Sequence, residues 1–310
     1  MEAWMKEIPG SESWTSVREI SYGWSGERKM HIRREGGEDL LLRVSDGEKY
    51  EKMLAIHTAM QPLNALALPA SRAVDCGRAQ QGALSWALLT YIDGEDLEGA
   101  LPELPEEEQY RLGREAGAIL RRIHGIPAPQ DRTDWAAHFG AKMDRKRRRW
   151  HEVGFQAEGC ERAFAFIDER RPLLAGRAQS LQHGDYHCGN MVLTPDGHVG
   201  VIDFNRLDWG DPWEEFNRIV WDVRASHAFA AGQIDGYFAP EAPPALFWEL
   251  LALYVTCDQI SALPWAVQFG EGELEIALQN FQAVRSWYDD FRTTLPSWYA
   301  PRRENGPLKK

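Results

Sequence analysis

The residues with the clearest chemical potential lie in the sequence HGDYHCGN at positions 183–190. This stretch contains two histidines, a carboxylate, a thiol and an amide, and a further carboxylate, Asp203, follows in VIDF at 201–204. Such a group of side chains could bind a metal ion, provide a nucleophile and its base, or form an ordinary polar loop. The surrounding sequence has to separate these three hypotheses.

The segment between the two motifs has the pattern of a β-hairpin, because MVLT and HVGVIDF flank the turn-forming residues PDG at 195–197. If Asp196 and Gly197 form a two-residue turn, strand pairing sets Asn190 opposite Asp203. Amide and carboxylate oxygens are hard ligands of the kind that Mg²⁺ prefers. The sequence therefore predicts a Mg²⁺ site made by Asn190 and Asp203, with Asp185 in the loop just before the hairpin.

Two alternatives remain for the same cluster. His183 and His187 have the i, i+4 spacing of a zinc-binding helix, but Gly184 and Gly189 favour a loop and no HExxH pattern is present. A metal-dependent hydrolase that uses the histidine pair is the corresponding functional hypothesis. Cys188 as a nucleophile would require a depressed thiol pKa, for which the sequence gives no sign.

The elements that must position these residues change character along the chain. Short strands broken by glycines are expected over 17–45, a helix over 46–60 and a buried strand over 83–94, whereas long helices are expected over 104–127, 212–230, 244–260 and 272–294. We expect an α+β fold with two lobes. Residues 1–92 form a small lobe with an antiparallel sheet and one helix, and residues 93–310 form a larger, mostly helical lobe.

HGDYHCGN followed by VIDF resembles the catalytic and metal-binding motifs of the aminoglycoside phosphotransferase family, whose fold is that of the protein kinases. The resemblance implies that Asp185 is the catalytic base toward the acceptor hydroxyl. It also implies that Asn190 and Asp203 bind Mg²⁺ on the phosphates of ATP or GTP, and that His183 supports the loop. Asp211, in GDPWEEF, has the sequence context of a helix cap and is expected to support the catalytic loop.

The resemblance extends upstream of these motifs. SYGWSGERK at 21–29 stands where such kinases cover the nucleotide phosphates, with Ser25 able to bond to phosphate. Arg43, in LLLRV, stands where kinases carry the phosphate-pairing lysine, and its charge and fork of donors suit that role. Its expected partner on the following helix is Glu51, with Glu48 as the competing choice.

LLTYIDG at 88–94 resembles the hinge that joins the two lobes in this fold. In such a hinge the backbone groups of Thr90 and Ile92 would meet the purine base. The alternative is a plain buried strand.

The chain carries a net charge of −12, and residues 181–300 contain 17 Asp and Glu against 5 Arg and no Lys, which is the same net charge. Such an excess of acid either serves solubility or creates a field that attracts a cationic ligand, and on either interpretation nucleic-acid binding is not expected. Seven of the thirteen tryptophans also lie between 209 and 298, where an exposed indole could hold a cation. The acidic candidates for contact with an amine-rich acceptor are Asp208, Asp222, Asp258, Glu271 and Glu275.

The four cysteines lie at wide intervals without a CxxC pair, and the chain shows no charged-then-apolar leader. We expect reduced thiols and a cytoplasmic protein. Apolar runs such as ALLTYI at 87–92 are shorter than the roughly 18 residues that span a bilayer, so no membrane association is expected.

Together these features predict an O-phosphotransferase that uses ATP or GTP with Mg²⁺. Its acceptor is a hydroxyl of a small molecule, with an aminoglycoside-like antibiotic as the first candidate and antibiotic resistance as the associated role. A macrolide, a choline-like amine or a metabolite is the alternative acceptor. A kinase-like protein that binds a nucleotide without transferring phosphate is the alternative outside enzymes.

Overall fold

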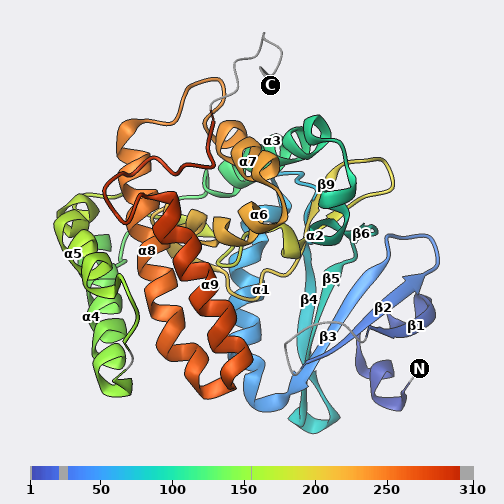
Figure 1. Ribbon diagram of the computed structural model, residues 1–310. Coiled ribbons are helices and arrows are strands. Elements are labelled where there is room, and N and C mark those ends of the chain that lie inside the picture. The colour runs from blue at the N-terminus through green and yellow to red at the C-terminus, as the bar shows by residue number, and fades with distance from the viewer. Residues whose placement is uncertain (1, 21–26, 155, 301–310) are drawn as a thin grey trace. The chain divides into compact units, whose positions relative to one another are not determined.

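The computed structural model describes residues 2–20, 27–154 and 156–300 and divides into two compact units (Figure 1). The first unit contains the chain up to Leu97 together with residues 190–207, and the second contains residues 98–189 and the chain from Asp208 onward. The hairpin at 190–207, which the sequence-based boundaries include in the second lobe, thus groups with the first unit.

A five-stranded antiparallel sheet with the order β1-β2-β3-β5-β4 forms the centre of the first unit. Its strands are β1 (Trp14–Ile20), β2 (Arg28–Arg34), β3 (Leu40–Asp46), β4 (Ala73–Ala79) and β5 (Leu84–Thr90). Helix α1 (Tyr50–Asn64) connects β3 to β4. The strands predicted over 17–45 and 83–94 are present, and so is the helix predicted over 46–60. Strand β4 was not predicted.

Alternation along the strands separates two faces of this sheet. Ile32, Leu42, Val44 and Leu88 are buried in one apolar cluster, which also receives Trp4 from an N-terminal 3-10 helix. Because successive side chains of a strand point to opposite faces, residues 29, 31 and 43 lie on the other face. The polar positions of β2 and β3 are therefore gathered on one side of the sheet.

Short elements complete the first unit. A three-stranded sheet contains β6 (Glu95–Asp96), β8 (Met191–Leu193) and β9 (Val199–Val201). The 3-10 helices are η1 (Ala3–Glu7), η2 (Ser11–Ser13), η3 (Gly47–Lys49) and η4 (Gln80–Gly82).

Most of the second unit is helical (Figure 1). Its helices are α2 (Leu97–Ala100, which begins at the last residue of the first unit), α3 (Glu106–Ile123), α4 (Trp135–Val153), α5 (Cys160–Arg170), α6 (Ile219–Ala225), α7 (His227–Phe238), α8 (Ala245–Ala266) and α9 (Glu271–Trp287). The shorter elements are η5 (Leu101–Glu103), η6 (Arg171–Leu174), β7 (Ser180–Gln182), η7 (Cys188–Asn190), β10 (Asp208–Gly210), η8 (Glu214–Arg218) and η9 (Val267–Phe269).

The helical segment predicted over 212–230 is interrupted. It forms η8, α6 and the start of α7, with extended backbone at Ser226 (φ −162°, ψ 119°). The Ser226 side chain accepts a hydrogen bond from Phe229 N at 3.0 Å and so caps α7. A side-chain cap thus starts a new helix inside an apolar pattern that favours a single one.

Helices α3 and α7 pack backbone to backbone because glycines face each other. A Cβ atom at Gly117 would lie 2.0 Å from Gln233 O, and one at Gly232 would lie 2.3 Å from Tyr110 O. Neither position has room for a side chain. The pattern places small residues at the helix contact, so α3 is held closely against α7.

Helix α8 extends further than the predicted segment. The stretch from Ala245 to Phe269 is long and apolar enough to cross a membrane by length and composition, with a mean hydropathy of 1.3. The expectation that every apolar run is shorter than a membrane span therefore does not hold for this helix. However, 72% of that window is buried inside the protein. The burial accounts for the composition, because a core helix surrounded by protein is apolar on every side.

Candidate active site

The loop that carries Asp185 is fixed from beneath by the buried carboxylate of Glu215. Gly184 N donates to Glu215 Oε1 at 2.9 Å, and His124 Nε2 lies 3.7 Å from Glu215 Oε2. Burial alone would raise the pKa of Glu215, but the neighbouring His124, the charge of His183 and the Gly184 amide outweigh it and lower that pKa. Glu215 is therefore an ionised anchor for the loop backbone.

Asp222 provides a second anchor. Cys188 N donates to Asp222 Oδ1 at 2.7 Å, and the side chain of Asp222 has 0% exposure. Burial raises the pKa of this carboxyl to about 7. The prediction that Asp222 contacts an acceptor does not fit this position, because no surface of the residue is open to a ligand.

Asp211 is also fully buried, and its contacts fit the supporting role expected from the sequence. Its carboxylate accepts two bonds from Arg177, at 2.6 and 3.0 Å, and one from the hydroxyl of Tyr254 at 2.7 Å. The main-chain oxygen of Asp211 accepts from Gln182 Nε2 at 2.8 Å. Gln182 is the residue before His183, so this network holds the strand that leads into the loop.

Asp185 itself is partly exposed, with 20% of its side chain accessible. Arg218 Nε lies 3.2 Å from Asp185 Oδ1, and His187 Nε2 lies 4.0 Å from the same oxygen. Neither Glu215 nor Arg218 was singled out from the sequence. Both occur in EEFNR at 214–218, directly after the GDPW turn, and that proximity was the available signal.

The two histidines and the cysteine of the motif stabilise the loop. His183 Nδ1 accepts from Asp185 N at 3.3 Å, and His187 Nδ1 accepts from Gly189 N at 3.2 Å. Cys188 is fully buried. Within the residues that the structure describes, no group of three His, Cys, Asp or Glu side chains could hold a metal ion, so the zinc hypothesis gains no support.

The hairpin register differs from the predicted one by a single residue. Met191 pairs with Val201, and Ile202 N donates to Asn190 O at 3.0 Å, so Asn190 lies opposite Ile202 and not Asp203. The turn contains three residues, 195–197, with Gly197 at φ +81°. A type I turn followed by a left-handed glycine explains the extra residue, so the predicted two-residue turn is wrong.

Asp203 lies just beyond the paired strand in a left-handed conformation, with φ +65°. This region is uncommon for residues other than glycine and occurs often at functional sites. Asp203 Oδ1 is buried and forms no hydrogen bond within the described residues, while Oδ2 lies 3.6 Å from Lys29 Nζ. A carboxylate oxygen left without a donor fits a site for a cation such as Mg²⁺.

The cations near Asp203 come from the sheet of the same unit. Lys29 pairs with Arg43 across β2 and β3, and was not predicted as a site residue. Arg43 donates from Nε to Glu27 at 3.0 Å and has a second contact to the same oxygen through Nη2. The predicted pairing of Arg43 with Glu51 is wrong, because Glu51 lies on the exposed side of α1 and pairs with Arg78 at 3.2 Å.

Two predicted nucleotide contacts can be compared with the hinge backbone. Thr90 N donates to Arg72 O at 2.9 Å, so this amide is used within the protein, while that bond leaves the Thr90 carbonyl uninvolved. The contacts of the Thr90 and Ile92 backbone with a purine stay predictions. Ser25 lies outside the described residues.

The remaining acidic candidates differ in their surroundings. Asp208 is exposed and lies 3.4 Å from Arg132 Nη2. Asp258 has contacts to two cations, Arg218 at 3.5 Å and Lys146 at 4.0 Å. Glu271 and Glu275 are exposed on α9. Of these carboxylates, Asp258 is the one that shares a partner with Asp185.

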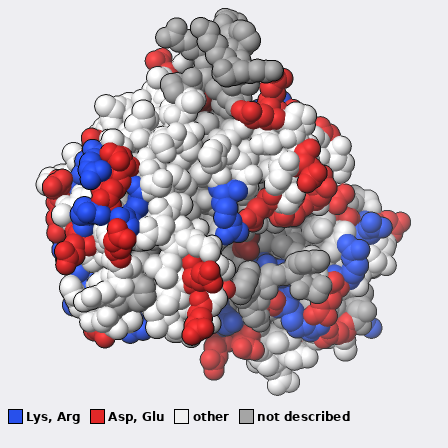
Figure 2. All heavy atoms as spheres, in the orientation of Figure 1, with Lys and Arg blue, Asp and Glu red and all other residues white. Residues whose placement is uncertain are grey.

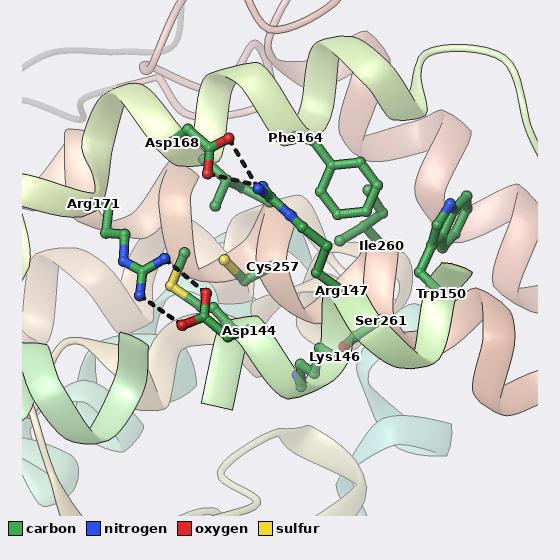
Figure 3. A pocket seen from close by; sticks show the side chains of 12 residues that line it. Asp144, Lys146, Arg147, Trp150, Phe164, Asp168, Arg171, Cys257, Ile260 and Ser261 are labelled. Atoms are coloured by element: carbon green, nitrogen blue, oxygen red, sulfur yellow. Dashed lines mark hydrogen bonds and ion pairs between the residues drawn. The ribbon is translucent and has the colours of Figure 1, made fainter. Parts of the chain in front are cut away.

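A small cavity between α4, α5 and α8 is lined by residues including Lys146, Phe164 and Cys257 (Figure 3). Two ion pairs border it, Arg147 with Asp168 at 2.8 Å and Arg171 with Asp144 at 2.8 Å. Its volume of about 20 Å³ has room for one water and not for an acceptor. These pairs also explain the mixture of basic and acidic side chains over α4 and α5 in Figure 2.

A model of a family described as the phosphotransferase enzyme family matches residues 16–248. A comparison with curated protein sequences found no match.

Solved structures of aminoglycoside phosphotransferases share the fold. A thermostable mutant of APH(4)-Ia in a ternary complex with ADP and hygromycin B is 20% identical, with a TM-score of 0.63, over 92% of this chain and 98% of that one. The GDP complex of wild-type aminoglycoside 2'-phosphotransferase-IIIa is 17% identical, with a TM-score of 0.64, over 91% and 95% of the two chains. The predicted kinase-like fold, with an antiparallel sheet and one helix before a mostly helical part, is confirmed.

Proposed function

Because this chain belongs to the phosphotransferase enzyme family, we propose that it transfers the γ-phosphate of ATP or GTP to a hydroxyl group of a small molecule. The observation that carries the proposal is the state of Asp185. Its carboxylate is partly exposed on a loop whose backbone is held by two buried acids, Glu215 and Asp222. A group fixed in this way suits general-base catalysis, in which positioning accounts for much of the rate.

In this proposal Asp185 accepts the proton of the acceptor hydroxyl while the acceptor oxygen bonds to the γ-phosphorus and the bond to the leaving diphosphate breaks. Asn190 and Asp203 would hold Mg²⁺, which supplies positive charge against the phosphate oxygens. Lys29 and Arg43 add fixed cations on the face of the sheet near Asp203. The local support for the metal is Asp203 Oδ1, which is buried and forms no hydrogen bond within the part of the chain that the structure describes.

An aminoglycoside-like antibiotic remains the first acceptor to test, since the fold is shared with enzymes whose structures contain hygromycin B or kanamycin. The net charge of −12 also favours a cationic ligand. Antibiotic resistance would then be the role of the protein, in the cytoplasm, where the nucleotide is supplied.

A second acceptor class is favoured by the charges around Asp185. Asp258, which was expected to attract amines, is compensated by Arg218 and Lys146. A site whose carboxylates are already paired gains little from a polycation and accommodates a neutral or anionic metabolite more easily. A metabolite kinase is therefore the second candidate.

A nucleotide-consumption screen tests both proposals. The purified protein is assayed with ATP and with GTP, with Mg²⁺, against aminoglycosides, macrolides, amino alcohols, and hydroxylated metabolites with and without an anionic group. Release of ADP or GDP that depends on the acceptor, and that is lost in Asp185→Asn, supports transfer. Nucleotide binding without phosphorylation of any acceptor would instead favour a binding protein.

A further inference from the structure

A series of alternating charges leads from α4 to Asp185. Lys146 Nζ lies 4.0 Å from Asp258 Oδ1, Asp258 Oδ2 lies 3.5 Å from Arg218 Nη1, and Arg218 Nε lies 3.2 Å from Asp185 Oδ1. The four residues come from α4, α8, η8 and the loop before η7. Segments far apart in the sequence thus converge on one carboxylate within the second unit.

The neighbouring charged groups are also paired. Lys142 Nζ lies 2.9 Å from Glu214 Oε1, and Glu214 Oε2 accepts from Gln182 Nε2 at 3.2 Å. The attraction of Glu214 outweighs burial and raises the pKa of Lys142. Lys142 and Glu214 compensate each other, and His187, at 4.0 Å, is the more distant neighbour of Asp185. Arg218, at 3.2 Å, is therefore closer to Asp185 than His187 is.

Arg218 is built into the protein more firmly than a surface arginine. Its side chain is 24% exposed, and its Nε is shielded from solvent without forming a hydrogen bond within the described residues. The attraction of Asp258, followed by that of Asp185, outweighs burial and raises the pKa of Arg218. The contact with Asp185 is thus a close ionic one, which acts on the charge of the carboxylate without a linear hydrogen bond to it.

We propose that Arg218 is the positioning residue of Asp185, which it keeps oriented, and that Asp258 and Lys146 hold Arg218 in that place. Positioning of a base accounts for much of its contribution to the rate. An oriented Asp185 carboxylate is the group that would accept the acceptor proton. The inference rests on the proposed function in one respect, namely that Asp185 is the base.

Kinetics of Arg218 variants provide the first test. The nucleophile is water or the hydroxyl of an acceptor that the nucleotide-consumption screen identifies. Arg218→Ala should lower kcat about 10- to 100-fold while the KM for the nucleotide changes less than about twofold, because the charge acts on the base. Arg218→Lys should recover part of kcat, and added ethylguanidinium should recover part of it in Arg218→Ala. A merely structural role would respond to neither.

A matched control removes another arginine of the second unit. Arg147→Ala breaks the ion pair with Asp168, at 2.8 Å, beside the small cavity and away from the recorded contacts of Asp185. It should retain the wild-type kcat. If Arg218→Ala does not fold, Arg218→Lys and Asp258→Asn carry the comparison, since Asp258→Asn should weaken the hold on Arg218 and lower kcat less than Arg218→Ala would.

A second measurement separates this inference from the proposed function. The carboxyl ¹³C resonance of Asp185, assigned by its loss in Asp185→Asn, is compared at one neutral pH in the wild type, in Arg218→Ala and in the control Arg147→Ala. The resonance should shift and broaden in Arg218→Ala and stay unchanged in Arg147→Ala, because only the first variant removes the partner that orients the carboxylate, even if no acceptor is phosphorylated. Failure of transfer by the wild type would overturn the proposed function alone.

An unchanged Asp185 resonance in Arg218→Ala would overturn the inference whether or not the wild type is active. In an active protein, a wild-type kcat in Arg218→Ala would overturn it as well, because the ion pair would then make no contribution to the reaction.

Discussion

Lys29 lies directly opposite Arg43 in the register of β2 and β3, yet the two cations have different partners. Lys29 Nζ lies 3.6 Å from Asp203 Oδ2, whereas Arg43 is bound to Glu27 through two nitrogens. Side chains of directly opposed residues occupy one face of a sheet. Lys29 therefore places its ammonium group next to Asp203, the proposed metal ligand. It lies on β2, whereas the kinase pattern indicates the β3 position that Arg43 occupies.

Lys29→Ala should raise the KM for the nucleotide about tenfold, because loss of one charge-assisted contact to phosphate costs about 1.4 kcal/mol. Arg43→Ala should have the smaller effect on KM, since Arg43 is already paired with Glu27. Initial-rate kinetics or nucleotide titration measures both. Arg28→Ala, on the exposed neighbour that pairs with Glu2 and Glu19, is the control and should leave KM unchanged. A larger effect for Arg43→Ala would contradict the assignment.

Asp185→Asn should reduce turnover about 10²- to 10⁴-fold while nucleotide affinity is retained, since the amide keeps the shape of the side chain but cannot accept the proton. Steady-state rates and nucleotide titration on the same preparation measure the two effects. Wild-type turnover in this variant would remove Asp185 from the role of base.

Asp203→Asn should weaken the contribution of Mg²⁺ to nucleotide binding. In the wild type we expect ADP to bind more tightly with Mg²⁺ than without it, and in the variant this difference should shrink about tenfold, because a charged ligand of the cation is lost. Calorimetric titration with and without Mg²⁺ provides the comparison. Equal Mg²⁺ dependence in both proteins would argue against Asp203 as a ligand.

Asp222 should make the stability of the fold depend on pH. Burial raises the pKa of its carboxyl from the ordinary value of 3.8 to about 7, so the folded state holds a proton that the unfolded state releases at lower pH. The resulting stabilisation is fully present below about pH 4 and is lost as the pH rises toward 7. In Asp222→Asn, the free energy of unfolding should fall less over that window than in the wild type. Parallel stability curves from urea unfolding would contradict this expectation.

Gly117→Ala should destabilise the protein by about 1 to 3 kcal/mol or more, because the added methyl group would lie 2.0 Å from Gln233 O and force α3 and α7 apart. Gly272→Ala is the matched control, since a Cβ there meets nothing within 4 Å and lies in α9, where alanine favours the helix. Urea midpoints should fall for the first variant and stay the same or rise for the second. Equal midpoints would show that the helix contact tolerates a side chain.

The sequence by itself determined the fold class and the position of the motif. The short apolar runs of β3 and β5, bounded by turn residues, and the amphipathic pattern of α3 are local signals, set by the backbone periods and lengths of strands and helices. The spacing of Asp185, Asn190 and Asp203 is likewise a property of one continuous stretch, so the family could be inferred from it.

Only the tertiary structure decided what surrounds those residues. The hairpin register depended on one left-handed glycine, Gly197, and the partner of Arg43 is Glu27 because a long helix turned Glu51 outward. The pairing of Asp185 with Arg218, and of Arg218 with Asp258, joins residues 33 and 40 positions apart in the sequence. Such contacts have no sequence period, because they arise from the packing of separate elements, and they decide which side chains surround the candidate base.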